Sequence, residues 1–325
     1  RFFCENIVNN PSAQGIPYVD KYDLTVSPFL TAEAAYRRII EDLKAAEEIM
    51  QENGEYFDDA DKQNNEFLKD RQIHMNLYAI QGMLARVYWM KGDLKTAAEY
   101  AQKILDCKYF ELVDKSEIED LINGVLSPKE TIWGLFSANF YTNVRADLYL
   151  SGGSSSLFLK ADHDDTYMAD KEGTDYRYEK WFKNYSAIEA SGMRCIKVLD
   201  TYELNYATRS DARVKGVNML RLPELYYIIT EYYLSIDNQT EAVKYFDKVL
   251  VSRGLTGYAD RQGATLTLEK VIQERRKELV CEGQYFFTQK RYNQNIYEPK
   301  SGKIYQASND IYVLPLPENE TEYRY

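Results

Sequence analysis

The sequence predicts a mainly α-helical fold in which paired helices form a scaffold around a long region of loops. Apolar residues recur at three- and four-residue intervals in several long stretches, as they do on the buried face of a helix. Two of the predicted helical pairs share one residue spacing, and a region rich in Gly, Ser, Asp, Asn and aromatic residues separates them. We therefore expect a single domain over residues 1–325, with a loop-rich insertion that carries short strands.

The first predicted helices precede the insertion. Thr31 can cap a helix over 32–51, because its hydroxyl can accept a hydrogen bond from a free amide of the first turn. A second helix is expected over 73–91, where it stops at Gly92, and Asp93 can cap the helix that follows. The second and third helices should therefore form a hairpin.

A second hairpin is predicted after the insertion. Its first helix covers 220–236, and its second follows the turn "DNQ". A last helix is expected from Thr267 to just before Gly283, because glycine tolerates the backbone angles that end a helix. Beyond it the chain should be extended, since "IYVLPLPENE" is too rich in proline for a helix.

The two hairpins place small and large residues at the same intervals. Small residues let two helices approach closely and large ones fill the groove between hairpins, which is the spacing of tetratricopeptide repeats. Because the hairpins are far apart in the sequence rather than in tandem, we expect tetratricopeptide-like hairpins but no regular solenoid. The first reads Ala85-x2-Tyr88-x8-Ala97-x3-Ala101-x2-Ile104, and the second reads Thr230-x2-Tyr233-x8-Ala242-x3-Phe246-x2-Val249.

Between the hairpins, over about 123–195, the helical pattern stops. "TIWGLF" is a short β-like run, and the remainder is typical of loops with isolated strands. Long structured loops on a helical scaffold often carry binding sites. The predicted parts are thus two helical repeat parts, a loop-rich region and an extended C-terminal segment, at about 31–107 and 218–283, 123–195, and 284–325 respectively.

Composition excludes several classes of function. The chain has 40 basic and 51 acidic residues, a net charge of -11, so a phosphate backbone would be repelled and nucleic acid is excluded as a partner. Apolar runs fall short of the roughly 18 residues that a membrane-spanning helix needs. With only His74 and His163, a histidine-based catalytic triad or multi-histidine metal site has almost no material. We expect neither an enzyme nor a cofactor.

The four cysteines are scattered, with no C-x-x-C pair and no histidine at zinc-site spacing. We expect Cys4, Cys107, Cys195 and Cys281 to be free or buried thiols. Cys4 follows Arg1-Phe2-Phe3, whereas a lipidated bacterial cysteine follows small and apolar residues, so it is not expected to be a lipid anchor.

Three stretches, in order along the chain, resemble the SusD/RagB family, the outer-membrane nutrient-binding lipoproteins of Bacteroidetes. "GIPYVDKYDLTVSPFLTAEAAYRRIIEDLKAAEEIM" resembles the segment before one of the family's repeat helices, and "MLRLPELYYIITEYYL" resembles its R-L-x-E-x-Y helix. "ERRKELVCEGQYFFTQKR", followed by "YVLPLPENE", resembles its C-terminal signature of an E-R-x-x-E-L helix, an E-G turn, an aromatic-basic stretch and a P-x-P-x-x-E ending.

The resemblance implies a helical repeat scaffold with a looped ligand-binding face. It also implies a surface location at the outer membrane, where the protein covers a TonB-dependent transporter of the SusC type and binds an oligosaccharide without catalysis. Family members usually carry more residues before the "PYV" segment, among them a lipidated cysteine. We therefore expect the lipid anchor, and part of any binding surface, to lie in an N-terminal portion that this sequence does not include.

A sugar site needs aromatic rings for the apolar face of a pyranose, and planar amide, carboxylate or guanidinium groups for its hydroxyls. The chain has 29 tyrosines, and the loop-rich region interleaves aromatic and planar polar residues in two places. The alternative is that these rings cover the helical core. The two candidate sets are Tyr141, Asn143, Arg145 and Tyr149, and Tyr176, Arg177, Tyr178 and Trp181.

Three alternatives stay open at this stage. The stretch "ADHDDTYMAD" offers Asp162, Asp164 and Asp165 as calcium ligands, but it lacks the glycine and terminal glutamate of an EF-hand, which favours a solvated acidic loop. The hairpins alone would also suit a tetratricopeptide-type scaffold for a protein partner. A glycosidase would need two carboxylates at a fixed separation, which a sequence does not reveal.

Residues 274–291 combine many charges with three aromatic rings near the C-terminus. Glu274 and Glu278 share one face of the predicted helix, Gly283 ends it, and nothing there supplies a nucleophile. Lys290 and Arg291 are expected to pair internally. We interpret the stretch as a structural staple that closes the helical scaffold.

Overall fold

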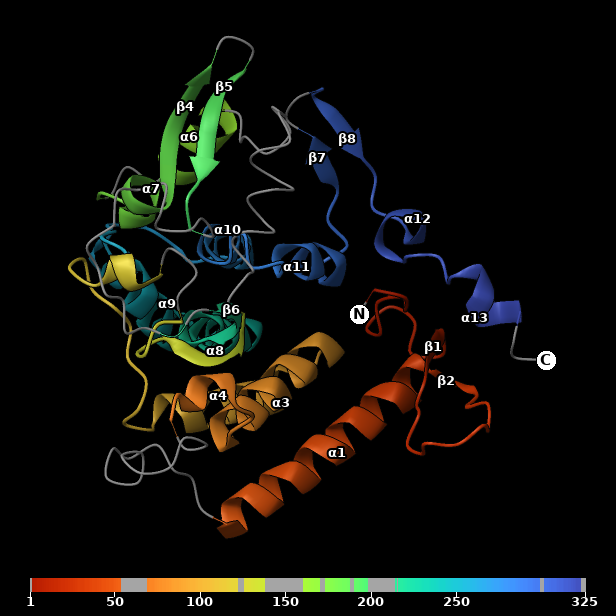
Figure 1. Ribbon diagram of the computed structural model, residues 1–325. Coiled ribbons are helices and arrows are strands. Elements are labelled where there is room, and N and C mark those ends of the chain that lie inside the picture. Colours follow the sequence, from red (N-terminus) through yellow and green to blue (C-terminus); the bar gives the residue numbers. More distant parts are fainter. Residues whose placement is uncertain are drawn as a thin grey trace.

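The structure is a computed structural model of residues 1–325 (Figure 1). It describes residues 2–53, 69–121, 126–137, 160–169, 173–187, 190–197, 214, 216–298 and 301–322. The fold is mainly α-helical, as predicted, and its helices lie in successive layers from α1 to α10 (Figure 1). None of the helices within these ranges is both long and apolar enough to cross a membrane.

The first layers are α1 (Ala32–Asn53) and the hairpin of α3 (Leu77–Lys91) and α4 (Leu94–Leu105), preceded by a 3-10 turn at Arg71–Ile73. Asn76 caps α3 and Asp93 caps α4, each accepting a hydrogen bond from a backbone amide of the first turn. Gly92 lies between the two helices with a φ of 89°. The chain therefore turns at the glycine, as the sequence predicted.

The second hairpin joins α8 (Leu222–Ser235) to α9 (Gln239–Ser252), and α10 (Leu268–Glu278) packs against α8. The first hairpin packs on the second mainly through α4 and α8. The small and large residues of the shared spacing are buried where the helices meet, except Tyr233, which is partly buried. Ala97 and Ala242 are fully buried. The predicted tetratricopeptide-like hairpins are therefore confirmed.

A short antiparallel sheet pairs β3 (Thr131–Phe136), the predicted "TIWGLF" strand, with β6 (Gly216–Arg221). Strand β6 leads directly into α8 and so connects the loop-rich region to the second hairpin. Near the N-terminus, β1 (Gln14–Pro17) and β2 (Phe29–Thr31) form another antiparallel pair beside α1.

The loop-rich region contains more regular structure than predicted. A 3-10 turn at Ile118–Leu121 precedes it, and it includes α6 (Lys160–Tyr167), α7 (Tyr176–Trp181) and an antiparallel hairpin of β4 (Phe182–Ala187) and β5 (Ala190–Cys195). The expectation that helices stop here was wrong. Both helices have six to eight residues, too few for an apolar period to stand out, and the hydrophobic cluster between them forms only in the fold.

The C-terminal segment is also not simply extended. It contains α11 (Tyr285–Arg291), the hairpin of β7 (Ile296–Glu298) and β8 (Lys303–Tyr305), and two short helices, α12 (Asn309–Tyr312) and α13 (Glu318–Glu322). The prolines that argued against helix act only locally. Helix α11 forms because its rings pack on the N-terminus, with Phe2 stacked against Phe286 at 6.2 Å and edge-on to Phe287 at 4.8 Å.

Candidate functional site

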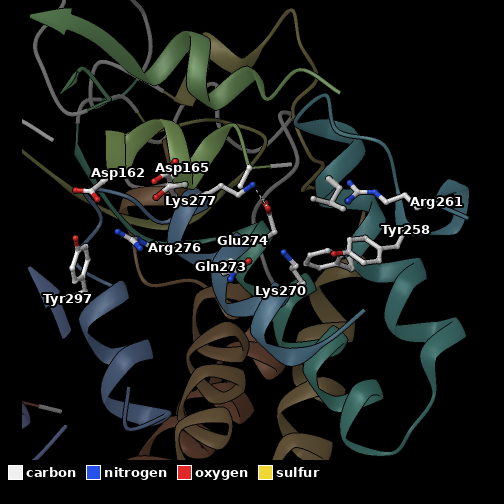
Figure 2. A pocket seen from close by; sticks show the side chains of 14 residues that line it. Asp162, Asp165, Tyr258, Arg261, Lys270, Gln273, Glu274, Arg276, Lys277 and Tyr297 are labelled. Atoms are coloured by element: carbon white, nitrogen blue, oxygen red, sulfur yellow. Dashed lines mark ion pairs between the residues drawn. The ribbon is translucent and has the colours of Figure 1, made fainter. Parts of the chain in front are cut away.

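A polar cavity of about 650 Å³ opens between α6, α9, α10, β7 and a 3-10 turn at Tyr258–Asp260 (Figure 2). Helix α6 belongs to the predicted loop-rich region, whereas α9 and α10 belong to the helical scaffold. The cavity therefore lies where the insertion meets the scaffold. Its volume is in the range of small-molecule binding sites.

Three polar residues of helix α10 form an exposed row that lines the cavity. Lys270, Gln273 and Arg276 recur at three-residue intervals and are exposed. Glu274 and Glu278 are buried, and Glu274 also lines the cavity. One short helix thus presents exposed hydrogen-bonding groups to the cavity and buried charges to the core.

Aromatic rings lie at opposite sides of the cavity (Figure 2). Tyr258 packs edge-on to Phe246, with ring centroids 5.6 Å apart, and the Arg261 guanidinium carbon lies 4.6 Å from the Tyr258 ring centroid. Tyr297, on β7, is 55% exposed. A ring this accessible can stack on the apolar face of a sugar, whereas Tyr258 forms part of the wall.

The polar groups around the cavity come from both of its sides. Asp162 and Asp165 come from α6, opposite Gln273 and Arg276 of α10 (Figure 2). Within the ranges that the structure describes, Lys270 and Arg276 make no ion pair, so their charges are available at the cavity. Carboxylate, amide and guanidinium groups together can donate hydrogen bonds to, and accept them from, neighbouring hydroxyls.

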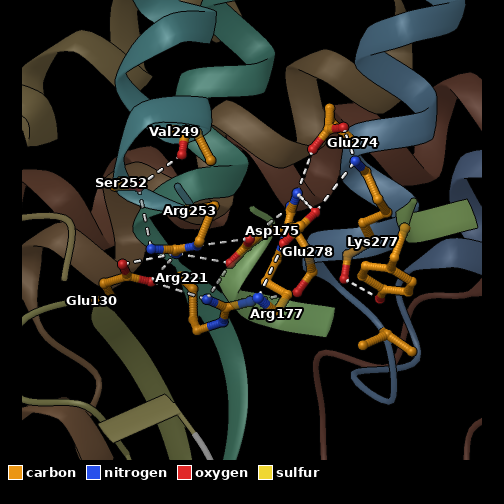
Figure 3. A network of polar contacts seen from close by, with 12 residues as sticks. Glu130, Asp175, Arg177, Arg221, Val249, Ser252, Arg253, Glu274, Lys277 and Glu278 are labelled. Carbon is orange, nitrogen blue, oxygen red and sulfur yellow. Dashed lines mark hydrogen bonds and ion pairs between the residues drawn. The ribbon is translucent and has the colours of Figure 1, made fainter. Parts of the chain in front are cut away.

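Behind the cavity wall, α10 is held by a buried network of ion pairs (Figure 3). Glu274 and Lys277 line the cavity and pair with each other. The fully buried Arg177 contacts Asp175 and Glu274, each at 2.7 Å, and Glu278 at 3.2 Å. The network thus links α7, in the loop-rich region, to the wall of the cavity.

Glu278 lies at the centre of the network, fully buried. It accepts hydrogen bonds from Arg177, Arg221 and Arg253, and the last two also bind Glu130. Burial alone would raise the pKa of Glu278, but the charges of Arg253 and Arg221 and the hydrogen bonds hold that pKa well below its usual value. Glu278 is therefore a stable anion and not a proton donor.

The stretch 274–291 staples the scaffold, as predicted. Arg275 and Arg291 both lie over Trp89 of α3, with their guanidinium carbons 4.3 and 4.6 Å from the ring centroid. Arg291 also pairs with Glu231 of α8 at 2.9 Å. Lys290 is buried and donates to the carbonyl oxygens of Cys4 and Tyr312. These contacts join both hairpins and both ends of the chain. The expected internal ion pairing is confirmed for Arg291, whereas Lys290 is held inside the fold by backbone carbonyls.

The structure places the two predicted sugar-binding sets very differently. The first set, Tyr141, Asn143, Arg145 and Tyr149, lies outside the described residues. In the second set, Tyr176 and Tyr178 are half-buried. The Tyr178 hydroxyl donates to Asp164 at 3.0 Å, and Lys115 lies 4.9 Å from the Tyr176 ring centroid.

Two members of the second set are corrected. Arg177 is committed to the buried ionic network, and Trp181 is fully buried with Lys197 Nζ 4.0 Å from its ring centroid. Neither side chain can contact a ligand at the surface, so the alternative that these groups belong to the core holds for both. From the sequence, Arg177 and Trp181 were expected at the surface, because a Tyr-Arg-Tyr pattern does not reveal which side chains the rest of the fold covers.

The calcium candidates lie along α6 rather than in a loop. Asp164 contacts the His163 ring at 3.3 Å and Tyr178, while Asp162 and Asp165 line the cavity. No group of three or more acidic, histidine or cysteine side chains suited to a metal ion occurs in the part of the chain that the structure describes. The calcium alternative has no supporting geometry there.

Sequence reasoning missed most residues of the cavity. Tyr258 and Arg261 come from one 3-10 turn and Tyr297 comes from β7, and nothing in their local sequences indicates a site. The available signal was the row of Lys270, Gln273 and Arg276, three polar residues spaced three apart on the predicted last helix.

The chain is similar to the proteins of a known family. A profile described as the SusD family matches residues 131–324, which is more than half of the chain. No curated protein matches the sequence.

Solved structures with the same fold come from Bacteroides. A SusD-like carbohydrate binding protein from Bacteroides vulgatus is 18% identical with a TM-score of 0.73, covering 98% of this chain and 71% of that one. A SusD superfamily protein from Bacteroides thetaiotaomicron is 17% identical with a TM-score of 0.74, covering 100% and 72%. Surface glycan-binding protein A from Bacteroides uniformis is 16% identical with a TM-score of 0.65, covering 94% and 70%. At these identities the likeness concerns the fold alone.

Proposed function

The chain belongs to the SusD family, and from that membership we propose that it binds an oligosaccharide without catalysis, as the surface-exposed subunit of a TonB-dependent nutrient-uptake complex. In this proposal it is held at the outer membrane by an N-terminal lipid and associates with a SusC-like transporter. Two of the similar structures are named for carbohydrate or glycan binding, which supports the choice of ligand.

The observation that carries the proposal is the composition of the cavity. Exposed Tyr297 offers a stacking surface, while Gln273, Arg276, Asp162 and Asp165 offer planar polar groups on both sides of the same space. A pyranose ring presents an apolar face and a rim of hydroxyls, so it matches both kinds of group. We therefore propose the cavity as the saccharide site, with Tyr176 and Tyr178 and the first predicted set as further candidates on the loop-rich side.

The proposal of binding without catalysis is supported by the ion pairs that the buried carboxylates of α10 form. Glu274 and Glu278, the last residue of α10, are tied up in buried ion pairs with arginine or lysine. A glycosidase needs one carboxyl group that stays protonated to act as an acid, and the arginine neighbours of Glu278 favour the opposite state by lowering its pKa.

A glycan array with the purified protein tests the proposal, followed by calorimetric titration of the best ligands and a reducing-sugar assay on the same samples. We expect binding to one or a few related glycans and no release of reducing sugar. Failure to bind any glycan would overturn the proposal. Release of sugar that a single substitution of Asp162 or Asp165 abolishes would instead favour a glycosidase.

A further inference from the structure

Two of the four cysteines, distant in sequence, meet in the fold. Cys195 ends β5, and Cys281 lies in the turn between α10 and α11. The two thiols are hydrogen-bonded to each other. Cys195 is 1% exposed, whereas Cys281 is exposed at the surface of the turn. One thiol is thus accessible to a reagent and the other is protected beside it.

The backbone on both sides of the pair is fixed by hydrogen bonds. The Lys197 ammonium donates to the carbonyl oxygens of Glu278 at 2.9 Å and Val280 at 3.3 Å, and to the Glu282 carboxylate at 2.5 Å. Lys197 follows Cys195 by two residues, so these bonds hold the end of β5 against the turn that carries Cys281. The encounter of the two thiols is therefore part of the packed fold.

The charges around the pair make the two sulfur atoms chemically unequal. The hydrogen bond from Cys195 and the charge of Lys197 lower the pKa of Cys281. Burial raises the pKa of Cys195 well above its usual value. Cys281 is thus the sulfur that ionises first and attacks in the first step, and Cys195 is the sulfur that reacts in the second step.

We propose that Cys195 and Cys281 are a redox-active pair that forms a reversible disulfide by exchange with an external disulfide, either a small molecule or a protein. The Cys281 thiolate attacks one sulfur of the external disulfide, whose S–S bond breaks and releases a thiolate that takes up a proton. Cys195 then loses its proton and attacks the Cys281 sulfur of the mixed disulfide, releasing the second external thiol. Two thiols of the protein are oxidised, and one external disulfide is reduced to two thiols.

The disulfide would tie the β4–β5 hairpin to the turn that follows α10. That turn also carries Glu282, which pairs with Arg221 at 2.7 Å, so the bond would restrain the edge of the ionic network. A bond across a long stretch of chain restricts the unfolded state most, and the oxidised protein should be the more stable form.

The test uses the full chain treated with glutathione disulfide, blocked with N-ethylmaleimide, digested without reduction and analysed by mass spectrometry. We expect a peptide pair linked through Cys195 and Cys281, a melting temperature about 5 °C above that of the reduced protein, and reversal of both by dithiothreitol. Cys281→Ser, at an exposed position, should abolish the link and the shift, whereas Cys107→Ser should leave both unchanged.

A stable glutathione adduct on Cys281 with no linked peptide would overturn the proposal, because it would show that Cys195 does not complete the exchange. Recovery of both cysteines as maleimide adducts after prolonged oxidation would overturn it too. Both readouts come from the wild-type protein, so the result does not depend on whether a variant folds.

Discussion

Arg253 and Glu278 face each other in the core, and the guanidinium donates two hydrogen bonds to the carboxylate, from Nε at 3.0 Å and from Nη2 at 2.9 Å. Arg253 follows the end of α9, and Glu278 is the last residue of α10. The pair therefore fixes the end of the second hairpin to the helix that lines the cavity. Two parallel bonds between a guanidinium and a carboxylate also define the relative orientation of the two groups.

The first prediction concerns the charge of Glu278. Glu278→Gln keeps the shape of the side chain but leaves three buried arginines with one acidic partner fewer. Breaking a buried ion pair on one side costs about 3–5 kcal/mol, so we expect a loss of that order in the free energy of unfolding. Urea denaturation of the variant and the wild type gives the measurement.

The matched control for that experiment is Glu269→Gln, which removes the same charge from an exposed position on the same helix. It should change the free energy of unfolding by less than about 0.5 kcal/mol. Glycan affinity should stay within about two-fold in whatever fraction of Glu278→Gln is folded, since Glu278 does not line the cavity. A Glu278→Gln protein as stable as the wild type would contradict the structural role of the network.

The second prediction is a dependence of stability on pH. The pKa of Glu278 is held below its ordinary value of 4.5, and the pKa of Asp175, which burial alone would raise, is lowered by Arg177. A group with a lowered pKa contributes stability that is present above its ordinary pKa and is lost as pH falls towards the lowered one. We expect the urea midpoint to fall steeply below about pH 4.5.

Comparison of variants attributes that slope to the network. Glu278→Gln should show a flatter decline below about pH 4.5 than the wild type, because position 278 no longer takes up a proton on unfolding. Glu269→Gln should keep the wild-type slope. Identical slopes in all three proteins would mean that other carboxylates govern acid unfolding.

The third prediction concerns Gly254, where the end of α9 meets the segment before α7. Its φ is +84°, and an added Cβ would lie 2.3 Å from the Thr174 carbonyl oxygen and 2.5 Å from the Tyr176 ring. Since the chain there is also held by a hydrogen bond from the Tyr176 amide to the Arg253 carbonyl, the neighbours cannot simply move away. Gly254→Ala should cost about 4 kcal/mol in the free energy of unfolding.

Gly263→Ala separates the two causes of that loss. Gly263 has a similar φ of +71°, but an added Cβ would meet nothing within 4 Å. It should therefore cost about 1 kcal/mol, the penalty for the left-handed backbone alone. Equal losses in the two variants would show that the close approach of the chain at Gly254 contributes nothing.

The fourth prediction locates the ligand. Tyr297→Ala should weaken glycan binding by about ten-fold, because it removes the exposed ring of the cavity. Tyr305→Ala is the control, since Tyr305 lies on the partner strand β8 at 38% exposure and does not line the cavity. Titration of both variants with the best ligand from the array gives the affinities. A greater loss in Tyr305→Ala would place the site elsewhere on the protein.

The helices could be predicted largely from the sequence, because the signals that form them are local. Thr31 and Asp93 cap the helices that they were expected to cap, and the predicted helix at 32–51 corresponds to α1 at Ala32–Asn53. The shared spacing of the hairpins was informative for the same reason. Each of its positions is set by contacts within one pair of helices.

The cavity and the ionic core could not be predicted in the same way. Glu278 was expected on a charged helix face, but its partners Arg177, Arg221 and Arg253 come from three separate elements. A charged residue in the sequence is normally exposed, and only the simultaneous approach of several opposite charges makes its burial favourable. The same limit explains why Arg177 was taken for a ligand-binding residue.

The sequence by itself determined the family, the helical hairpins and the closing role of residues 274–291, because each depends on residue types at fixed short spacings. Only the tertiary structure decided which polar residues face solvent and which are buried. It joined α6, α10 and β7 into one cavity and brought Cys195 to Cys281. The reason is that a site depends on distances between segments far apart in the chain, which packing sets and local patterns do not encode.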